Sequence, residues 1–342
     1  MGKFFKIVWV LMLFFSIDAS AQNIVQGTSD TAKNVTHDTL AKQQTGETVE
    51  DLMTRAKAGD EDALLDLGYM FLYGANGVNI DYKAALSYYQ QAAELGNATA
   101  YNNLGSLYFN GIGTEADYKK AISYFEKAAQ AGSSDAAVNL AIIYLRDVDK
   151  NNIPSTFKKV KDLLLMAQEK NLTAKYLSGY AYKNGILFNK DMKKAFSFIK
   201  QAADEGYDEA QYVLSEFYIN GTATSKNYAR AVEYLQKAAK QGHPPATMQL
   251  ADILSLGEIY PQDIKQAYIL YNTAAGAGIS GAAGKRDELE KKLGIEDLLA
   301  AQAEAENIKP EPTEQTKFIR QTFGESLKKY LDSYINLEIT QE

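Results

Sequence analysis

The stretch from Asn97 to Gly132, NATAYNNLGSLYFNGIGTEADYKKAISYFEKAAQAG, decides the fold of this chain. Its apolar side chains recur at intervals of three and four residues, as at Ala100, Leu104 and Tyr108. This spacing places them on one face of a helix. Gly111 follows, and glycine can end a helix in the left-handed conformation at little steric cost. The stretch therefore predicts two helices joined by a turn, the first about 13 residues long.

The same unit recurs along the chain with a period near 36 residues. Six units end in a loop glycine, at Gly59, Gly96, Gly132, Gly206, Gly242 and Gly278. Lys170 occupies the corresponding position of the remaining unit. An alanine follows each of these seven positions by four residues: Ala63, Ala100, Ala136, Ala174, Ala210, Ala246 and Ala282. A fixed period of this length is typical of repeat architectures, in which each unit buries its apolar flank on the next. The sequence predicts six helix pairs.

Capping residues mark the helix ends inside each unit. A glycine closes the first helix at Gly74, Gly111, Gly185, Gly221 and Gly257. The second helix begins after Asp81, Asp117, Asp191, Asn227 or Asp263. Side chains of this kind accept hydrogen bonds from the free amides of a first turn, so we interpret them as N-caps rather than as catalytic acids.

The recurring string Ala-x3-Leu-Gly-x2-Tyr-x2-Gly, followed by an acidic cap, Lys-Ala, an aromatic pair, Ala-Ala and Gly, resembles the Sel-one-like repeat (SLR), a relative of the tetratricopeptide repeat. The resemblance covers residues 49–308. It implies an all-α fold, a right-handed α-solenoid whose first helices line a concave groove, and roles in scaffolding or signalling assemblies. It implies no shared substrate.

Two parts of the array depart from the pattern. In the third copy Asp147 replaces the closing glycine and residues 149–154 are lengthened, which predicts a local bend or a looser stack. After Ala282 the pattern fades into residues 285–308, which we expect to form a charged capping helix. Its apolar side would carry Leu289, Leu293, Leu298 and Leu299.

Three segments lie outside the array. Residues 1–21 combine two lysines, an apolar run and Ala19-Ser20-Ala21, which predicts a cleavable signal peptide and a periplasmic or secreted protein. Residues 22–48 are polar and predict a flexible tether. Residues 309–342 predict a linker and an amphipathic helix carrying Phe318, Phe323, Leu327, Tyr330, Leu331, Tyr334 and Ile335. That helix folds back on the last repeat or docks on a partner or a second copy; both alternatives stay open.

Bulk composition narrows the function classes. The formal net charge is −7 and the basic residues form no block, which argues against a nucleic-acid partner. There is no cysteine, so disulfides and thiolate chemistry are excluded. The apolar run of residues 7–17 is too short to span a membrane, so no stable insertion is expected after signal cleavage.

The catalytic inventory is thin. There are two histidines: His37 lies in the predicted tether, and His243 occupies a loop position held elsewhere by Asn97, Ser133 or Tyr207. Three Ser-x-x-Lys pairs occur without the other motifs of penicillin-binding enzymes, and we interpret them as surface coincidences: Ser155/Lys158, Ser197/Lys200 and Ser326/Lys329. The sequence predicts no enzyme, no cofactor and no metal site.

If the first helix of each unit lines the groove, as the resemblance implies, the positions beside its core stripe would meet a partner. They are Tyr69, Tyr73, Asn102, Asn110, Arg146, Tyr176, Tyr180, Asn184, Tyr212, Glu216 and Asn220. Tyrosine offers contact area with a polar handle, and an asparagine amide can bond both backbone groups of an extended peptide. Asn110, Asn184 and Asn220 also precede closing glycines, so helix termination is the favoured interpretation of these three, and both roles can coexist.

These observations favour an exported interaction scaffold that holds a protein or peptide in its groove. Two alternatives remain: a cell-wall accessory or weak hydrolase associated with peptidoglycan or β-lactams, and a secreted effector or invasion factor acting on host proteins. Self-association through the C-terminal helix is a further expectation.

Overall fold

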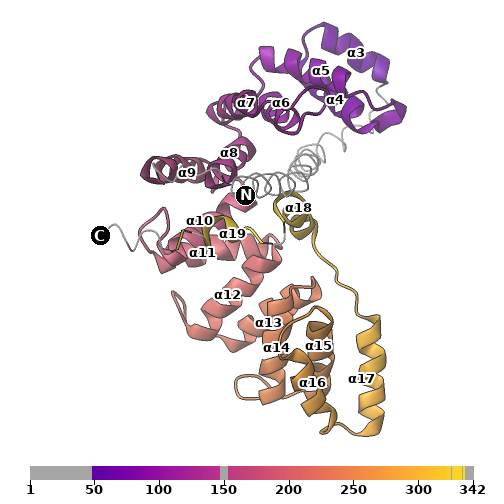
Figure 1. Cartoon of the computed structure of the whole chain (residues 1–342), viewed down its shortest axis with the longest axis vertical. Helices are drawn as coiled ribbons and strands as arrows, with labels where there is room; N and C mark the ends of the chain where they lie inside the picture. Colours follow the sequence, from indigo (N-terminus) through magenta and orange to yellow (C-terminus); the bar gives the residue numbers. More distant parts are fainter. Residues whose placement is uncertain (1–47, 147–152, 325, 333, 336–342) are drawn as a thin grey trace, which may run out of the picture. The chain divides into compact units, whose positions relative to one another are not determined.

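The computed structural model describes residues 48–146, 153–324, 326–332 and 334–335, and all regular elements in this part of the chain are helices (Figure 1). The predicted signal peptide and most of the predicted tether lie outside the described residues. The described residues divide into two compact units, one within residues 48–174 and 318–332 and the other within residues 175–317 and 334–335.

The first unit contains one leading helix and three helix pairs. α3 (Val49–Lys57) precedes the pairs, which are α4 (Glu61–Tyr73) with α5 (Tyr82–Glu94), α6 (Ala98–Asn110) with α7 (Tyr118–Gln130), and α8 (Ser134–Arg146) with α9 (Ile153–Ala167). A short 3₁₀ helix, η2 (Ala75–Gly77), follows α4. The lengthened part of the third copy lies largely outside the described residues, and its second helix is α9.

The second unit continues the same alternation. Its pairs are α10 (Leu172–Asn184) with α11 (Met192–Asp204), α12 (Asp208–Asn220) with α13 (Tyr228–Lys240), and α14 (Pro244–Leu256) with α15 (Ile264–Gly276). The first turn of α10 belongs to the first unit. The six predicted pairs are therefore all present, and each first helix has the predicted length of 13 residues.

The predicted caps form as the local chemistry requires. Each of the five proposed N-caps accepts a hydrogen bond from a first-turn amide through its side chain: Asp81, Asp117, Asp191, Asn227 and Asp263. Each of the five closing glycines has a left-handed φ between 67° and 77°. These turn residues fix the length of the helices and the direction of the chain after each one.

Small residues set how closely the two helices of a pair approach. The alanines that follow the loop positions are all fully buried, from Ala63 to Ala282. Gly105 of α6 lies directly under the ring of Phe125 of α7, so close that an added Cβ would stand 2.7 Å from two ring carbons. Gly68 and Tyr89 repeat this arrangement in α4 and α5. Large residues of the second helix thus pack into space that the first helix leaves open.

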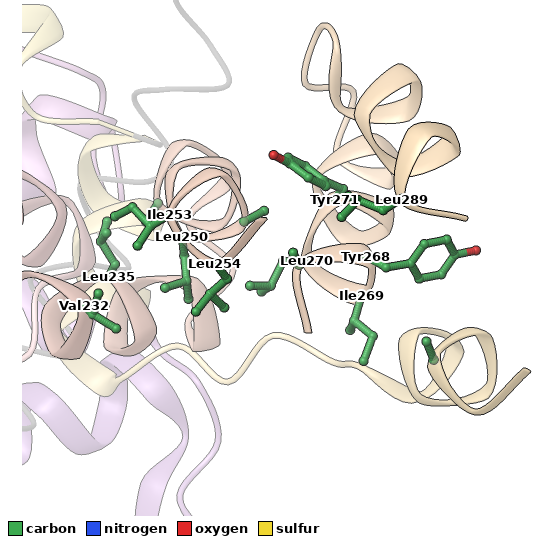
Figure 2. Packing of buried hydrophobic residues seen from close by; sticks show 14 of the residues in the cluster. Val232, Leu235, Leu250, Ile253, Leu254, Tyr268, Ile269, Leu270, Tyr271 and Leu289 are labelled. Atoms are coloured by element: carbon green, nitrogen blue, oxygen red, sulfur yellow. The ribbon is translucent and has the colours of Figure 1, made fainter. Parts of the chain in front are cut away.

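The hydrophobic core continues from one pair to the next within the second unit. In Figure 2, Leu250 and Leu254 of α14 lie between Leu235 of α13 and Leu270 of α15. These four side chains are at most 7 % exposed. The core cluster extends into α16 (Ala282–Glu290) and α17 (Ile295–Asn307), so the repeat array is covered at this end by helices that lack the repeat pattern.

The single capping helix predicted over residues 285–308 is wrong. The chain forms α16 and α17 instead, and Gly294 is the N-cap of α17. Leu289 is buried and Leu293 and Leu298 pack against the core cluster, but Leu299 is 59 % exposed. α17 packs on α15, and its buried residue is Ala301, which belongs to the same core cluster.

The single C-terminal helix is also wrong. The chain forms α18 (Glu314–Phe323) and the short α19 (Lys329–Asp332). Gly324, with φ of 88°, ends α18. Leu327 and Leu331 are fully buried in the first unit, and α19 packs on α8. This region therefore folds back on the array, but not on the last repeat.

Among the described residues, no helix has both the length and the apolarity that crossing a membrane requires.

Candidate partner-binding surface

The predicted groove residues all lie on the first helices of the pairs, which we call the A helices: α4, α6, α8, α10, α12 and α14. The positions beside the core stripe of these helices are called the A-helix surface. Its positions in the first unit and in the second unit are described separately.

In the first unit, Tyr69 and Tyr73 form an aromatic pair on α4. Their ring centroids are 4.8 Å apart and both side chains are half-buried. One turn of helix separates the two residues, so the pair presents a continuous aromatic edge with two hydroxyl groups. This chemistry suits contact with a polypeptide.

Asn102 is only 6 % exposed, because the next repeat covers it. Its Oδ1 accepts a hydrogen bond from Asn139 Nδ2 of α8 at 3.1 Å. The amide therefore joins two A helices, and the prediction that Asn102 faces a partner is wrong for this structure. A buried amide with its hydrogen bond made stabilises the stack instead.

Two of the asparagines that precede closing glycines bond within their own helix, in agreement with the alternative role at the helix end. Asn110 Nδ2 donates to Ser106 O at 2.8 Å, and Asn184 Nδ2 donates to Tyr180 O at 2.9 Å. Each amide thus bonds to a carbonyl one turn earlier in its own helix, close to the end of that helix. Asn220 is exposed at the corresponding position of α12.

In the second unit, the ring of Tyr176 is fully buried. It meets Tyr207 edge to face at a centroid distance of 4.9 Å and stacks on Tyr180 at 6.2 Å. Tyr180 is 8 % exposed. Both tyrosines were predicted to face a partner, but Tyr207 from the following loop packs on Tyr176, and both Tyr176 and Tyr180 are buried in this structure.

Tyr212 and Glu216 remain accessible on α12. The ring of Tyr212 stacks on His243 with centroids 5.0 Å apart, and both Tyr212 and Glu216 are half-buried. Glu216 pairs with Lys183 of α10 at 3.1 Å. Because both charges are about one third exposed, the pair contributes little to stability and leaves a carboxylate and an ammonium at the surface.

His243 is the N-cap of α14. Its Nδ1 accepts the amide hydrogen of Ala246 at 3.2 Å, and its side chain is buried beside Tyr212. The loop role that its place in the repeat indicated is therefore the one that the structure shows. Its Nε2 lies 4.0 Å from Glu209 Oε2.

Sequence reasoning missed a ladder of contacts between equivalent positions of successive repeats. Asn97 Nδ2 donates to Glu61 Oε2 at 3.0 Å, and Asn171 Nδ2 donates to Asp135 Oδ1 at 2.7 Å. Both bonds join residues 36 apart. Burial raises the pKa of Asp135, and the bond from Asn171 opposes that rise. These contacts could have been found in the sequence, because an asparagine follows an acidic residue after 36 positions in both cases.

Arg146 is exposed at the end of α8, close to the C-terminal helix α19 of the same unit. Burial raises the pKa of Tyr330, and the positive charge of Arg146 opposes that rise. The C-terminal region of this chain thus lies against α8, while Arg146 itself stays exposed. The accessible positions that remain are Tyr69, Tyr73, Asn110, Arg146, Asn184, Tyr212, Glu216 and Asn220.

The lysines of the three serine–lysine pairs each contact another side chain. Lys158 forms an ion pair with Asp162 at 2.9 Å, and Lys200 pairs with Asp204. The ammonium of Lys329 lies 5.0 Å above the ring of Tyr330. In the described part of the chain, no group of three or more histidine and acidic residues could hold a metal ion.

The comparisons with known proteins agree with this geometry. The model of the Sel1 repeat matches residues 61–97, 98–133, 173–207, 208–243 and 244–279, which is more than half of the chain. The chain therefore belongs to the Sel1 repeat family. The irregular third copy lies between the second and third matches. No curated protein matches the chain at a significant level.

Two solved structures have a similar fold. One is a protective antigen of uropathogenic Escherichia coli strains that displays an SLR fold, with 24 % identity, a TM-score of 0.62 and coverage of 86 % of this chain. This chain spans 59 % of that antigen's length. The other is a Sel1 repeat protein from Oxalobacter formigenes, with 22 % identity, a TM-score of 0.52 and coverage of 75 % of each chain.

Proposed function

We propose that this protein is an exported scaffold that holds a segment of a partner protein on its A-helix surface. Sel1 repeat proteins generally mediate protein–protein interactions. The observation that carries the proposal is the chemistry of the accessible positions, which include three tyrosines, three asparagines and the Glu216–Lys183 pair. Such a surface offers contact area and hydrogen bonds to a polypeptide.

The proposed export depends on residues 1–21. Lysines at positions 3 and 6, an apolar run and Ala19-Ser20-Ala21 are the three parts of a secretory signal. Intact-mass measurement of the protein recovered from an envelope or medium fraction tests it directly. We expect a mature chain that begins at Gln22. A chain that keeps Met1 and stays in the cytosolic fraction would overturn the proposed export.

Affinity capture with matched variants tests the surface. The variant Glu216→Ala/Asn220→Ala removes two accessible side chains of α12. The control Glu233→Ala/Lys237→Ala removes an exposed pair from α13, the second helix of the same repeat. We expect the α12 variant to recover the partner at least about fivefold less well than wild type, and the α13 control to recover it fully. Equal recovery by both variants contradicts the proposal.

A further inference from the structure

A short segment of the C-terminal region lies along two inter-repeat loops of the second unit. We call this segment, Pro310–Thr316, the strap. It follows α17, runs past the loops after α11 and α13, and enters α18. Its backbone is held at Glu311, whose amide donates to Lys240 O at 2.9 Å. The exposed side chains of Glu311 and Lys240 form an ion pair.

Two threonines of the strap carry most of its polar contacts. The amide of Thr313 donates to Gln241 Oε1 at 2.9 Å, and its hydroxyl donates to Gly206 O at 2.9 Å. The hydroxyl of Thr316 contacts Gln241 Oε1 at 2.6 Å and accepts the amide hydrogen of Asp208 at 3.2 Å. Thr316 is fully buried and Gln241 is 4 % exposed. Buried hydrogen bonds of this kind are costly to lose on one side only.

The loops present this site already oriented. Gln241 Nε2 donates to Gly206 O at 3.0 Å and to Gln211 Oε1 at 2.9 Å. Since a carbonyl oxygen can only accept, the first bond fixes which end of the Gln241 amide faces the strap. Gln211 is held in turn by a bond from its Nε2 to Ala203 O at 3.2 Å. The acceptor Oε1 of Gln241 therefore points at the strap through a connected network.

The absence of a side chain at two glycines lets the strap approach. A Cβ at Gly206 would lie 3.2 Å from Thr313 Cγ2, and a Cβ at Gly242 would lie 2.7 Å from Pro310 Cβ. The equivalent glycines of four other loops have nothing within 4 Å of such a Cβ: Gly59, Gly96, Gly132 and Gly278.

Among the residues that precede the loop glycines, a glutamine occurs only at Gln241. The position before the loop glycine holds Gln241 here, but it holds Ala58, Leu95, Ala131, Glu205 and Ala277 in the other copies. None of those side chains carries an amide that could donate and accept at once. The repeat thus supplies a loop of fixed geometry, and the substitution of glutamine supplies recognition.

From this geometry we infer that the loop pair at Gly206 and Gln241 is a peptide-binding site for a segment with the pattern Pro-x-x-Thr-x-x-Thr that begins a helix after its first threonine, as the strap does. The strap occupies the site in this chain. A partner protein that carries the same pattern binds there by displacing the strap. The site uses inter-repeat loop residues and the first turn of α12 rather than the predicted groove positions, so it adds a second, self-occupied place of interaction to the proposed scaffold.

The short connection between α17 and the strap determines how strongly the strap competes with a free peptide for the site. Two residues, Ile308 and Lys309, join the strap to α17, so the strap competes as an intramolecular ligand. A short linker gives an effective concentration on the order of millimolar. A free peptide must therefore bind the wild-type chain much more weakly than a chain whose own strap has lost its hydroxyls.

Peptide binding to the full chain tests the inference. The probe is a fluorescent peptide of residues 308–317, and its control carries valine in place of both threonines. The proteins are the full-length wild type, Thr313→Val/Thr316→Val, and the same double variant with Gln241→Leu. We expect the double variant to bind the probe at least tenfold more tightly than wild type, and Gln241→Leu to remove that gain.

The inference is overturned if the double variant, with native circular dichroism, binds the probe no better than wild type or binds the control peptide equally well. Hydrogen exchange on the full chain gives an independent readout that does not depend on the double variant. Gln241→Leu alone is expected to speed exchange at Glu311 and Thr313 by more than tenfold, while the amides in the middle of α13 keep their protection. Unchanged exchange at the strap also overturns it.

Discussion

Replacing Gly105 by alanine tests the packing rule on which the repeat depends. The substitution adds one methyl group in the middle of α6, at the point where the ring of Phe125 crosses it. In an exposed helix the same change stabilises, because alanine exceeds glycine in helix propensity by about 1 kcal/mol. The two effects have opposite signs, so the outcome depends on the contact between the helices.

The structure gives the size of the opposing term. The new Cβ would lie 2.7, 2.7 and 2.9 Å from three ring carbons of Phe125, well inside the 3.5–4.0 Å separation that carbon atoms prefer. Phe125 is fully buried, so its ring has no free space to enter. Overpacking costs about 1–3 kcal/mol, and an overlap near 1 Å against a confined ring belongs at the upper end. We expect a net loss of about 2 kcal/mol.

Urea unfolding followed by circular dichroism measures the effect on the whole chain. The matched control is Gly284→Ala in α16, where an added Cβ meets nothing within 4 Å. We expect Gly284→Ala to raise the unfolding midpoint or leave it unchanged and Gly105→Ala to lower it. Phe125→Leu in the Gly105→Ala background should restore part of the loss. A Gly105→Ala chain as stable as the Gly284→Ala chain would refute the reasoning.

The remaining predictions concern caps and cross-repeat bonds. A hydrogen bond from the Ala63 amide, together with the Arg55 guanidinium, holds the pKa of Asp60 below its ordinary value of 3.8. The ionised Asp60 carboxylate therefore stabilises the fold above pH 4, and this stabilisation is lost as the pH falls further. Asp60→Asn should accordingly flatten the fall in unfolding midpoint between pH 4 and pH 2. His243→Ala removes the N-cap of α14 and should cost about 1 kcal/mol in urea unfolding, whereas His243→Asn should recover most of it. Asn102→Ala and Asn139→Ala should be non-additive by about 1 kcal/mol in a double-mutant cycle, and additive losses would show that their bond contributes nothing.

The sequence predicted the repeated elements well because each helix end has a local chemical cause. Asp117 caps a helix and Gly111 closes one whatever lies beyond them, so both can be recognised without a structure. The two C-terminal predictions failed for a related reason. Gly294 and Gly324 lie inside segments with a helical apolar pattern, and the pattern was followed through residues that end helices.

The candidate surface was predicted less well because exposure on an A helix depends on the neighbouring repeat. Tyr176 has the right place on its helix, but Tyr207 of the following loop covers it. Asn102 is covered by Asn139 for the same reason. The strap site was missed although a signal existed, since Gln241 is the one amide among the residues that precede the loop glycines, where the other copies have alanine, leucine or glutamate.

Site-specific photo-crosslinking tests the central claim most directly, which is that the A-helix surface holds a protein partner. A photoreactive residue would replace Asn220, which is exposed on α12, or Lys193, which is exposed on α11. After irradiation of intact cells, the account predicts a discrete crosslinked product from position 220 and none of that mass from position 193, with Glu216→Ala reducing the product. The same product from both positions, or a product from position 193 alone, would contradict the claim.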